Sequence, residues 1–128
     1  MPIDYKHEII KARDYYFSLP KEVFCRCVGE DILLTRIGWD HLVNNKKRNL
    51  KQTYRRVKHI YLVKSILEEM PYFQVHSVRY KDIHEHKYWS IQAVLSKACI
   101  EIVIRQTGNQ QKHFYSLVYK GGSPRVID

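Results

Sequence analysis

The sequence predicts an α+β fold, with N-terminal helices followed by a four-stranded antiparallel β-sheet meander. Before Pro71, apolar residues recur every three to four positions, which is typical of helices packed on a core. After Pro71, apolar and polar residues alternate, which indicates strands, and the connections are short enough for hairpins. The 128 residues have the size of one domain. We therefore expect a single domain over residues 1–120 and a flexible tail over residues 121–128.

Helical stretches are predicted over residues 4–17, 36–43 and 50–70. The first ends before Pro20, because the residue preceding a proline disfavours the helical conformation. Thr35 and Asn49 are expected to cap the second and third, since their side chains can accept hydrogen bonds from the first helical turn. The dense apolar run at residues 60–63 leaves open a break in the third helix.

Extended segments make up the rest of the predicted fold. Two short pieces, over residues 23–28 and 32–34, are expected between the first two helices. The strands of the predicted sheet lie at residues 72–80, 87–95, 98–106 and 111–119. In the third strand Ile100, Ile102 and Ile104 share one face, so we expect them in the core. Because the helices can cover only one face of this sheet, the opposite face is free for a ligand.

The chain is strongly basic, with a formal net charge of +9, and the charge is clustered. Residues 41–67 contain no acid and eight basic residues: Lys46, Lys47, Arg48, Lys51, Arg55, Arg56, Lys58 and Lys64. Such clustering is typical of nucleic-acid binding, and ten tyrosines and two tryptophans offer surfaces on which bases can stack. A solvated basic face, or one that meets an acidic protein or an anionic membrane, is the alternative.

Several other classes of protein are disfavoured. The chain has no apolar run long enough to cross a membrane, and its charged N-terminus is unlike a signal peptide, so we expect a cytoplasmic protein. Three cysteines leave one unpaired in any disulfide scheme. Cys25-Arg26-Cys27 lacks a second pair of ligands, and His84-Glu85-His86 falls in an expected loop without a third ligand. We therefore expect neither a metal site nor a cofactor.

The polar residues of the last hairpin suit the cleavage of RNA without a metal. That reaction needs a base for the ribose 2′-OH, an acid for the leaving 5′-oxygen, and cations for the phosphate. The last two strands bring together Arg105, Lys112, His113, Tyr115 and Ser116, while His41, Arg55 and Arg56 come from the preceding helices. For any single histidine, an ordinary hydrogen-bonding role is the alternative interpretation.

Several phrases of the sequence resemble a known group of nucleases. These phrases are Leu33-Leu34-Thr35-Arg36-Ile37-Gly38-Trp39-Asp40-His41, Thr53-Tyr54-Arg55-Arg56, Tyr88-Trp89-Ser90-Ile91-Gln92-Ala93-Val94, Val103-Ile104-Arg105-Gln106 and Lys112-His113-Phe114-Tyr115-Ser116. Over about residues 32–120 the chain resembles small bacterial and phage-associated members of the barnase, EndoU, colicin tRNase and RelE-like nuclease superfamily. The resemblance implies a nuclease-like domain of helices followed by a four-stranded antiparallel sheet. It also implies a toxin-like endoribonuclease that needs no metal and leaves a 2′,3′-cyclic phosphate.

The resemblance also implies roles for individual residues. Its catalytic candidates are His41, Arg105, Lys112, His113, Tyr115 and Ser116, with His41 or His113 as base or acid. The resemblance implies that Arg55 and Arg56 hold the substrate backbone. Together with the clustered cations noted above they make up the candidates for substrate binding: Lys46, Lys47, Arg48, Arg55, Arg56 and Lys58. The implied partners are RNA, such as tRNA or mRNA, and an antitoxin or immunity protein. A catalytically silent RNA- or DNA-binding module or regulator, and a protein-interaction domain with a basic face, remain open alternatives.

Overall fold

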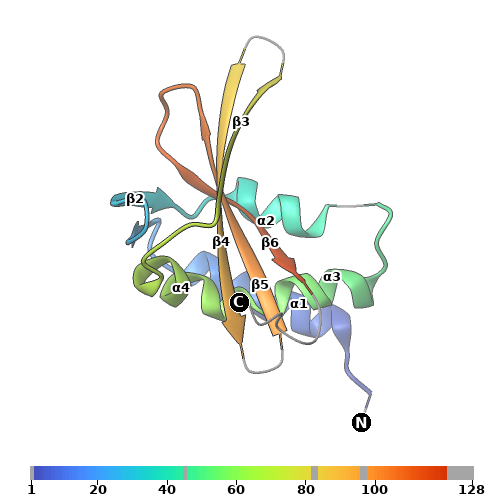
Figure 1. Ribbon diagram of the computed structural model, residues 1–128. Helices are drawn as coiled ribbons and strands as arrows, with labels where there is room; N and C mark the ends of the chain where they lie inside the picture. Colours follow the sequence, from blue (N-terminus) through green and yellow to red (C-terminus); the bar gives the residue numbers. More distant parts are fainter. Residues whose placement is uncertain (1, 45, 82–83, 96–97, 121–128) are drawn as a thin grey trace.

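The computed structural model describes residues 2–44, 46–81, 84–95 and 98–120. The helices are α1 (Tyr5–Ser18), α2 (Arg36–Val43), α3 (Leu50–Val57), the 3₁₀-helix η1 (Ile60–Leu62) and α4 (Val63–Glu69). The strands are β1 (Glu22–Cys25), β2 (Glu30–Leu33), β3 (Val75–Lys81), β4 (His84–Leu95), β5 (Ala98–Thr107) and β6 (His113–Tyr119). This is an α+β fold, as predicted (Figure 1). The predicted tail, residues 121–128, lies outside the described residues.

The helices begin and end close to the predicted residues. The third predicted helix is broken near the apolar run at residues 60–63, where the sequence left a break open. Helix α3 ends at Val57, and η1 and α4 follow it. Asn49 caps α3 in a capping box. Its side chain accepts a hydrogen bond from the Gln52 backbone N–H, and the Gln52 side chain accepts one from the Asn49 backbone N–H. Thr35 precedes α2 but its side chain makes no capping hydrogen bond.

The sheet has six strands instead of the predicted four, in the order β1-β2-β6-β5-β4-β3. Strands β3 to β6 form the predicted antiparallel meander. The two short extended pieces extend it, because β1 pairs antiparallel with β2, and β2 runs parallel to the start of β6 at Leu33 and His113. The prediction failed here because this parallel contact joins segments far apart in the sequence, and local periodicity carries no information about such a contact.

The core lies between the helices and one face of the sheet. The predicted core residues Ile100, Ile102 and Ile104 are fully buried, which confirms that prediction. Further buried side chains come from the helices and the neighbouring strands: Leu42, Val57, Ile60, Val63, Leu67, Ile91, Phe114 and Leu117. The far halves of the β3–β4 and β5–β6 hairpins extend past the helix layer (Figure 1).

Helix α2 packs unusually close to β6 because it carries a glycine at the contact. A Cβ atom at Gly38 would lie 2.6 Å from both the Phe114 Cδ2 and the Phe114 carbonyl oxygen. Since one of these atoms belongs to the backbone, no side-chain rotation would relieve both contacts. Only glycine lets the two elements approach this closely at this position.

We expect Gly38→Ala to destabilise the protein. Overpacking of this kind costs roughly 1–3 kcal/mol, which outweighs the gain of about 1 kcal/mol that alanine offers over glycine in a helix. Urea denaturation followed by circular dichroism should show a lower midpoint. Ile37→Ala is the matched control, because Ile37 is on the same helix and exposed. Equal midpoints for the two variants would contradict the proposed packing.

Candidate functional site

The face of the sheet away from the isoleucine core carries polar and aromatic side chains. Residues directly opposite each other on paired strands point to the same face. Tyr88 on β4 is opposite Arg105 on β5, and Arg105 is opposite His113 on β6. Further along the same two strands, Val103 is opposite Ser116. The meander therefore gathers a row of polar groups on the face that the core does not use.

A β-bulge changes the direction of one residue in this row. Val103 pairs with Ser116 while Ile104 pairs with Phe114, so Tyr115 is the extra residue on β6. Bulges re-aim side chains and are common next to functional sites. Phe114 remains in the core, while the bulge lets both Tyr115 and Ser116 lie on the open face.

Side chains from two helices complete a hollow of about 340 Å³ over this face, which we call the sheet-face hollow. Its lining residues are His41, Arg56, Ser77, Arg79, Tyr88, Ser90, Glu101, Val103, Tyr115, Ser116 and Val118. The helices can reach it because β2 pairs with β6 only at His113, which leaves the later edge of β6 free of a strand among the described residues. Arg56 occupies part of that edge, donating hydrogen bonds to the Leu117 carbonyl (3.1 Å) and to Ser116 Oγ (2.9 Å).

Tyr115 is the centre of an aromatic and cationic cluster. The His41 ring stacks on it with 4.2 Å between centroids, and the Arg105 guanidinium carbon lies 4.3 Å from its centroid. Tyr88 meets it edge-on at 5.8 Å, and Arg79 lies over Tyr88 at 5.6 Å. Contacts of this type hold cations in place while leaving their N–H donors available.

The two histidines of the candidate set have different environments. Burial, followed by the charges of Arg56, Arg48 and Arg105, lowers the pKa of His41 below its usual value, so this imidazole is neutral at pH 7. His113 is buried, and burial together with the charge of Arg105 lowers its pKa to about 4. Its neutral Nε2 accepts a hydrogen bond from Arg105 Nε at 3.2 Å. His41 is therefore placed to meet a ligand, whereas His113 is placed to hold Arg105.

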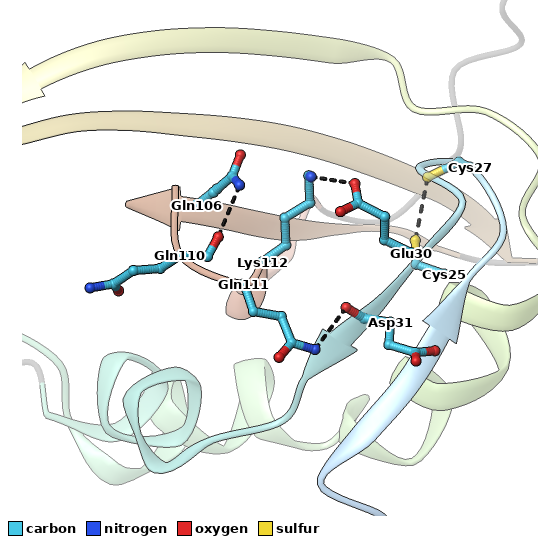
Figure 2. Close-up of polar contacts among 8 residues, drawn as sticks. All are labelled: Cys25, Cys27, Glu30, Asp31, Gln106, Gln110, Gln111 and Lys112. Carbon is cyan, nitrogen blue, oxygen red and sulfur yellow. Dashed lines mark hydrogen bonds and ion pairs between the residues drawn. The ribbon is translucent and has the colours of Figure 1, made fainter. Parts of the chain in front are cut away.

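Lys112 does not join this cluster. It precedes His113, so the alternation of the strand directs it to the core side of the sheet. Figure 2 shows its ammonium group paired with Glu30 of β2. The same ammonium lies 4.9 Å from the centroid of the Trp89 ring, and Lys112 as a whole is buried. The structure gives Lys112 a partner within the fold and places it away from His41 and Tyr115.

The predicted substrate-binding residues divide into two groups. Lys46, Lys47, Arg48 and Arg56 line a second hollow of about 430 Å³ together with His41 and Asn44; we call it the loop hollow. Arg55 is exposed and lines neither hollow, and Lys58 lies over the Tyr119 ring at 5.3 Å. Arg55 and Arg56 are neighbours on α3 but differ in environment, because Arg56 turns inward to donate a hydrogen bond to the β6 backbone.

The two motifs with possible metal ligands are arranged as follows. His84 and His86 lie in β4 instead of the predicted loop, and His86 Nδ1 is 3.1 Å from Thr107 Oγ1. The Cys25 and Cys27 sulfurs are 3.5 Å apart. Figure 2 marks the contact between them with a dashed line. Among the residues that the structure describes, no three histidine, cysteine, aspartate or glutamate side chains are grouped to hold a metal ion.

Sequence reasoning missed most of the strand residues that line the sheet-face hollow, among them Arg79 and Tyr88. Alternation along each strand places them on a definite face of that strand, but it does not say which face becomes the open one. The pairing of Tyr88 with Arg105 answers this, and it depends on the register between β4 and β5. The sequence did place a basic residue, Arg79, and a tyrosine, Tyr88, in the first two strands predicted after Pro71, and this was the available signal for their role in the site.

We expect Arg56→Gln to raise the pKa of His41, because a positive charge disfavours a protonated imidazole and its removal relieves that effect. Titration of the His41 ring by NMR measures this directly. Arg55→Gln is the matched control, since it removes the same charge from the neighbouring exposed position. A rise of the same size in both variants would contradict the specific effect of Arg56.

Known proteins do not add to these observations. Comparison with protein-family models, with curated proteins and with solved structures finds no match. No helix in the described part of the chain is long and apolar enough to span a membrane. The function must therefore be inferred from the side chains of the two hollows.

Proposed function

We propose that this protein is an endoribonuclease that cleaves RNA without a metal ion, by attack of the ribose 2′-OH on the adjacent phosphate. One observation carries the proposal: a neutral imidazole, His41, and two guanidinium groups, those of Arg105 and Arg56, are grouped around Tyr115 and Ser116 on an open face. These are the groups that such a cleavage needs, namely a base and cations that stabilise the charge on the phosphate.

In the proposed reaction, His41 accepts the proton of the 2′-OH as O2′ attacks phosphorus. The bond between phosphorus and O5′ breaks, and Tyr115, whose ring contacts both His41 and Arg105, donates a proton to the departing O5′. The products are a 2′,3′-cyclic phosphate and a free 5′-hydroxyl. The imidazolium then returns its proton to the phenolate, directly or through water, which restores both groups.

The remaining residues would act on the phosphate and on each other. Arg105 and Arg56 would stabilise the charge that builds up on the phosphate oxygens in the transition state. His113 would act as a positioning residue, because its buried neutral nitrogen accepts from Arg105 Nε and fixes that guanidinium. Ser116 would do the same for Arg56 by accepting its Nη2 donor.

The basic and aromatic lining supports RNA as the substrate. The one carboxylate among the described residues that line the sheet-face hollow, Glu101, pairs with Lys120 at 3.3 Å, so its charge is compensated. Unrestricted RNA cleavage in a cytoplasm would be toxic to the cell. We therefore extend the proposal to a toxin-like role with tRNA or mRNA as target and an antitoxin or immunity protein as inhibitor.

We expect the purified protein to cut RNA in the presence of EDTA and to leave 2′,3′-cyclic phosphate termini. A substrate with a single 2′-deoxyribose at the cut site should resist, because the nucleophile is missing. His41→Ala should slow cleavage roughly a hundredfold or more, the usual contribution of a general base. Binding of the resistant substrate should persist in this variant.

His7→Ala is the matched control, since His7 is exposed on α1 and contributes to neither hollow. It should cleave like the wild-type protein. Equal cleavage of the deoxy-substituted substrate would exclude attack by the 2′-OH. Tight binding with no cleavage at all would favour the catalytically silent nucleic-acid-binding module.

A second prediction tests the positioning role of His113. His113→Ala should lower kcat/KM by roughly tenfold or more, the value of a hydrogen bond to a charged group. His113→Gln should restore most of it, because its amide oxygen can accept from Arg105 Nε. Thermal unfolding of both variants separates this effect from stability. If glutamine fails as badly as alanine at equal stability, His113 does not act through Arg105.

A further inference from the structure

The loop hollow beside the sheet-face hollow is lined mainly by positively charged side chains. Its lining consists of Lys46, Lys47, Arg48 and Arg56 with the neutral His41 and Asn44, and it includes no carboxylate among the described residues. Both lysines are exposed, on the segment before α3. Like charges gathered around an open space repel one another, so an anion that enters is stabilised by all of them.

Arg48 has hydrogen-bonding capacity that the fold does not use. Its Nη2 donates a hydrogen bond to the Leu42 carbonyl at 2.9 Å and lies 3.5 Å from the His41 carbonyl oxygen. These contacts hold the guanidinium against the C-terminus of α2. Its Nε and Nη1 are shielded from solvent and have no partner among the described residues. Buried donors without acceptors are costly. Because Arg48 lines the loop hollow, an anion bound there would offer its guanidinium acceptors that the fold does not supply.

The two hollows are contiguous. His41 and Arg56 line both of them, so the Arg56 guanidinium stands at the boundary. Burial, followed by the positive charge of Arg48, lowers the pKa of Arg56. A ligand with negative charges at regular intervals could occupy the two hollows together, and an RNA strand carries one phosphate per nucleotide.

We infer that the loop hollow binds a second phosphate of the RNA strand whose scissile phosphate occupies the sheet-face hollow. The inference rests on the proposed function, and it adds that the substrate extends at least one phosphate beyond the cut. Arginine suits this role because its planar fork donates two parallel hydrogen bonds to phosphate oxygens. A minimal dinucleotide with one phosphate would leave the loop hollow without a ligand and lose its contribution to binding.

The test uses short 2′-deoxy probes that cannot be cleaved, so that it measures binding alone. A DNA dinucleotide with one internal phosphate is compared with the same probe carrying an additional 5′-phosphate and with one carrying an additional 3′-phosphate. NMR titration of the full chain at fixed salt gives the three affinities. We expect one terminal phosphate to tighten binding roughly tenfold or more, the value of charge-assisted hydrogen bonds. If the added 5′-phosphate tightens binding, the loop hollow lies on the 5′ side of the cut, and if the added 3′-phosphate does, it lies on the 3′ side.

Two variants then connect this gain to the loop hollow. Lys46→Ala/Lys47→Ala should reduce the gain from the terminal phosphate to less than about threefold, since two of the cations that line the hollow are lost. Arg48→Lys keeps the positive charge but loses the planar guanidinium, so it should also reduce the gain in affinity from the terminal phosphate. This single variant tests the inference even if the double variant folds poorly. Lys6→Ala/Lys21→Ala is the matched control, because it removes the same charge from exposed positions outside both hollows.

The outcomes distinguish this inference from the proposed function. A gain that is lost in the loop variants and kept in the control supports the second phosphate site, whether or not the protein cuts RNA. Equal affinities for all three probes would overturn it, even for a protein that cleaves RNA as proposed. A gain that survives in both loop variants would also overturn it, because the terminal phosphate would then bind elsewhere.

Discussion

The close contact between Gly38 and Phe114 determines how the candidate site is assembled. It brings α2 against β6 at a distance that a Cβ atom would prevent. His41 lies one helical turn after Gly38, on the same side of the helix, and Tyr115 directly follows Phe114. The approach of the two backbones therefore places the imidazole over the phenol ring. A helix held further from the strand by a larger residue would lose the contact between His41 and Tyr115.

The site concentrates positive charge at a cost to the folded state, and the surrounding groups offset part of that cost. Arg56 binds a strand carbonyl and a serine hydroxyl, Arg48 binds the end of α2, and Arg105 binds the neutral His113. None of these partners carries a negative charge, so the cations are held in position without being neutralised. A carboxylate in the same places would hold them as firmly but would leave less charge for an anionic ligand.

Adjacent residues of the last strand have opposite environments. Lys112 and His113 are neighbours in the sequence and were equal candidates for the site, but the strand sends their side chains to opposite faces. Lys112 is buried against Trp89 and paired with Glu30, which lies 82 residues earlier in the sequence. His113 supports Arg105 from within the open face. Proximity in the sequence was therefore a poor guide to the function of this pair.

The sequence alone determined the α+β class, the meander from β3 to β6, the isoleucine core and the basic character of the segment around α3, because each depends on local periodicity or composition. It also identified His41, Arg105 and Tyr115 as residues of interest. Only the tertiary structure decided that β1 and β2 join the sheet, that Tyr88 belongs to the hollow, and that Lys112 does not. These features depend on pairing between distant segments and on strand register, and a shift of one residue in register reverses the face on which every side chain of a strand lies.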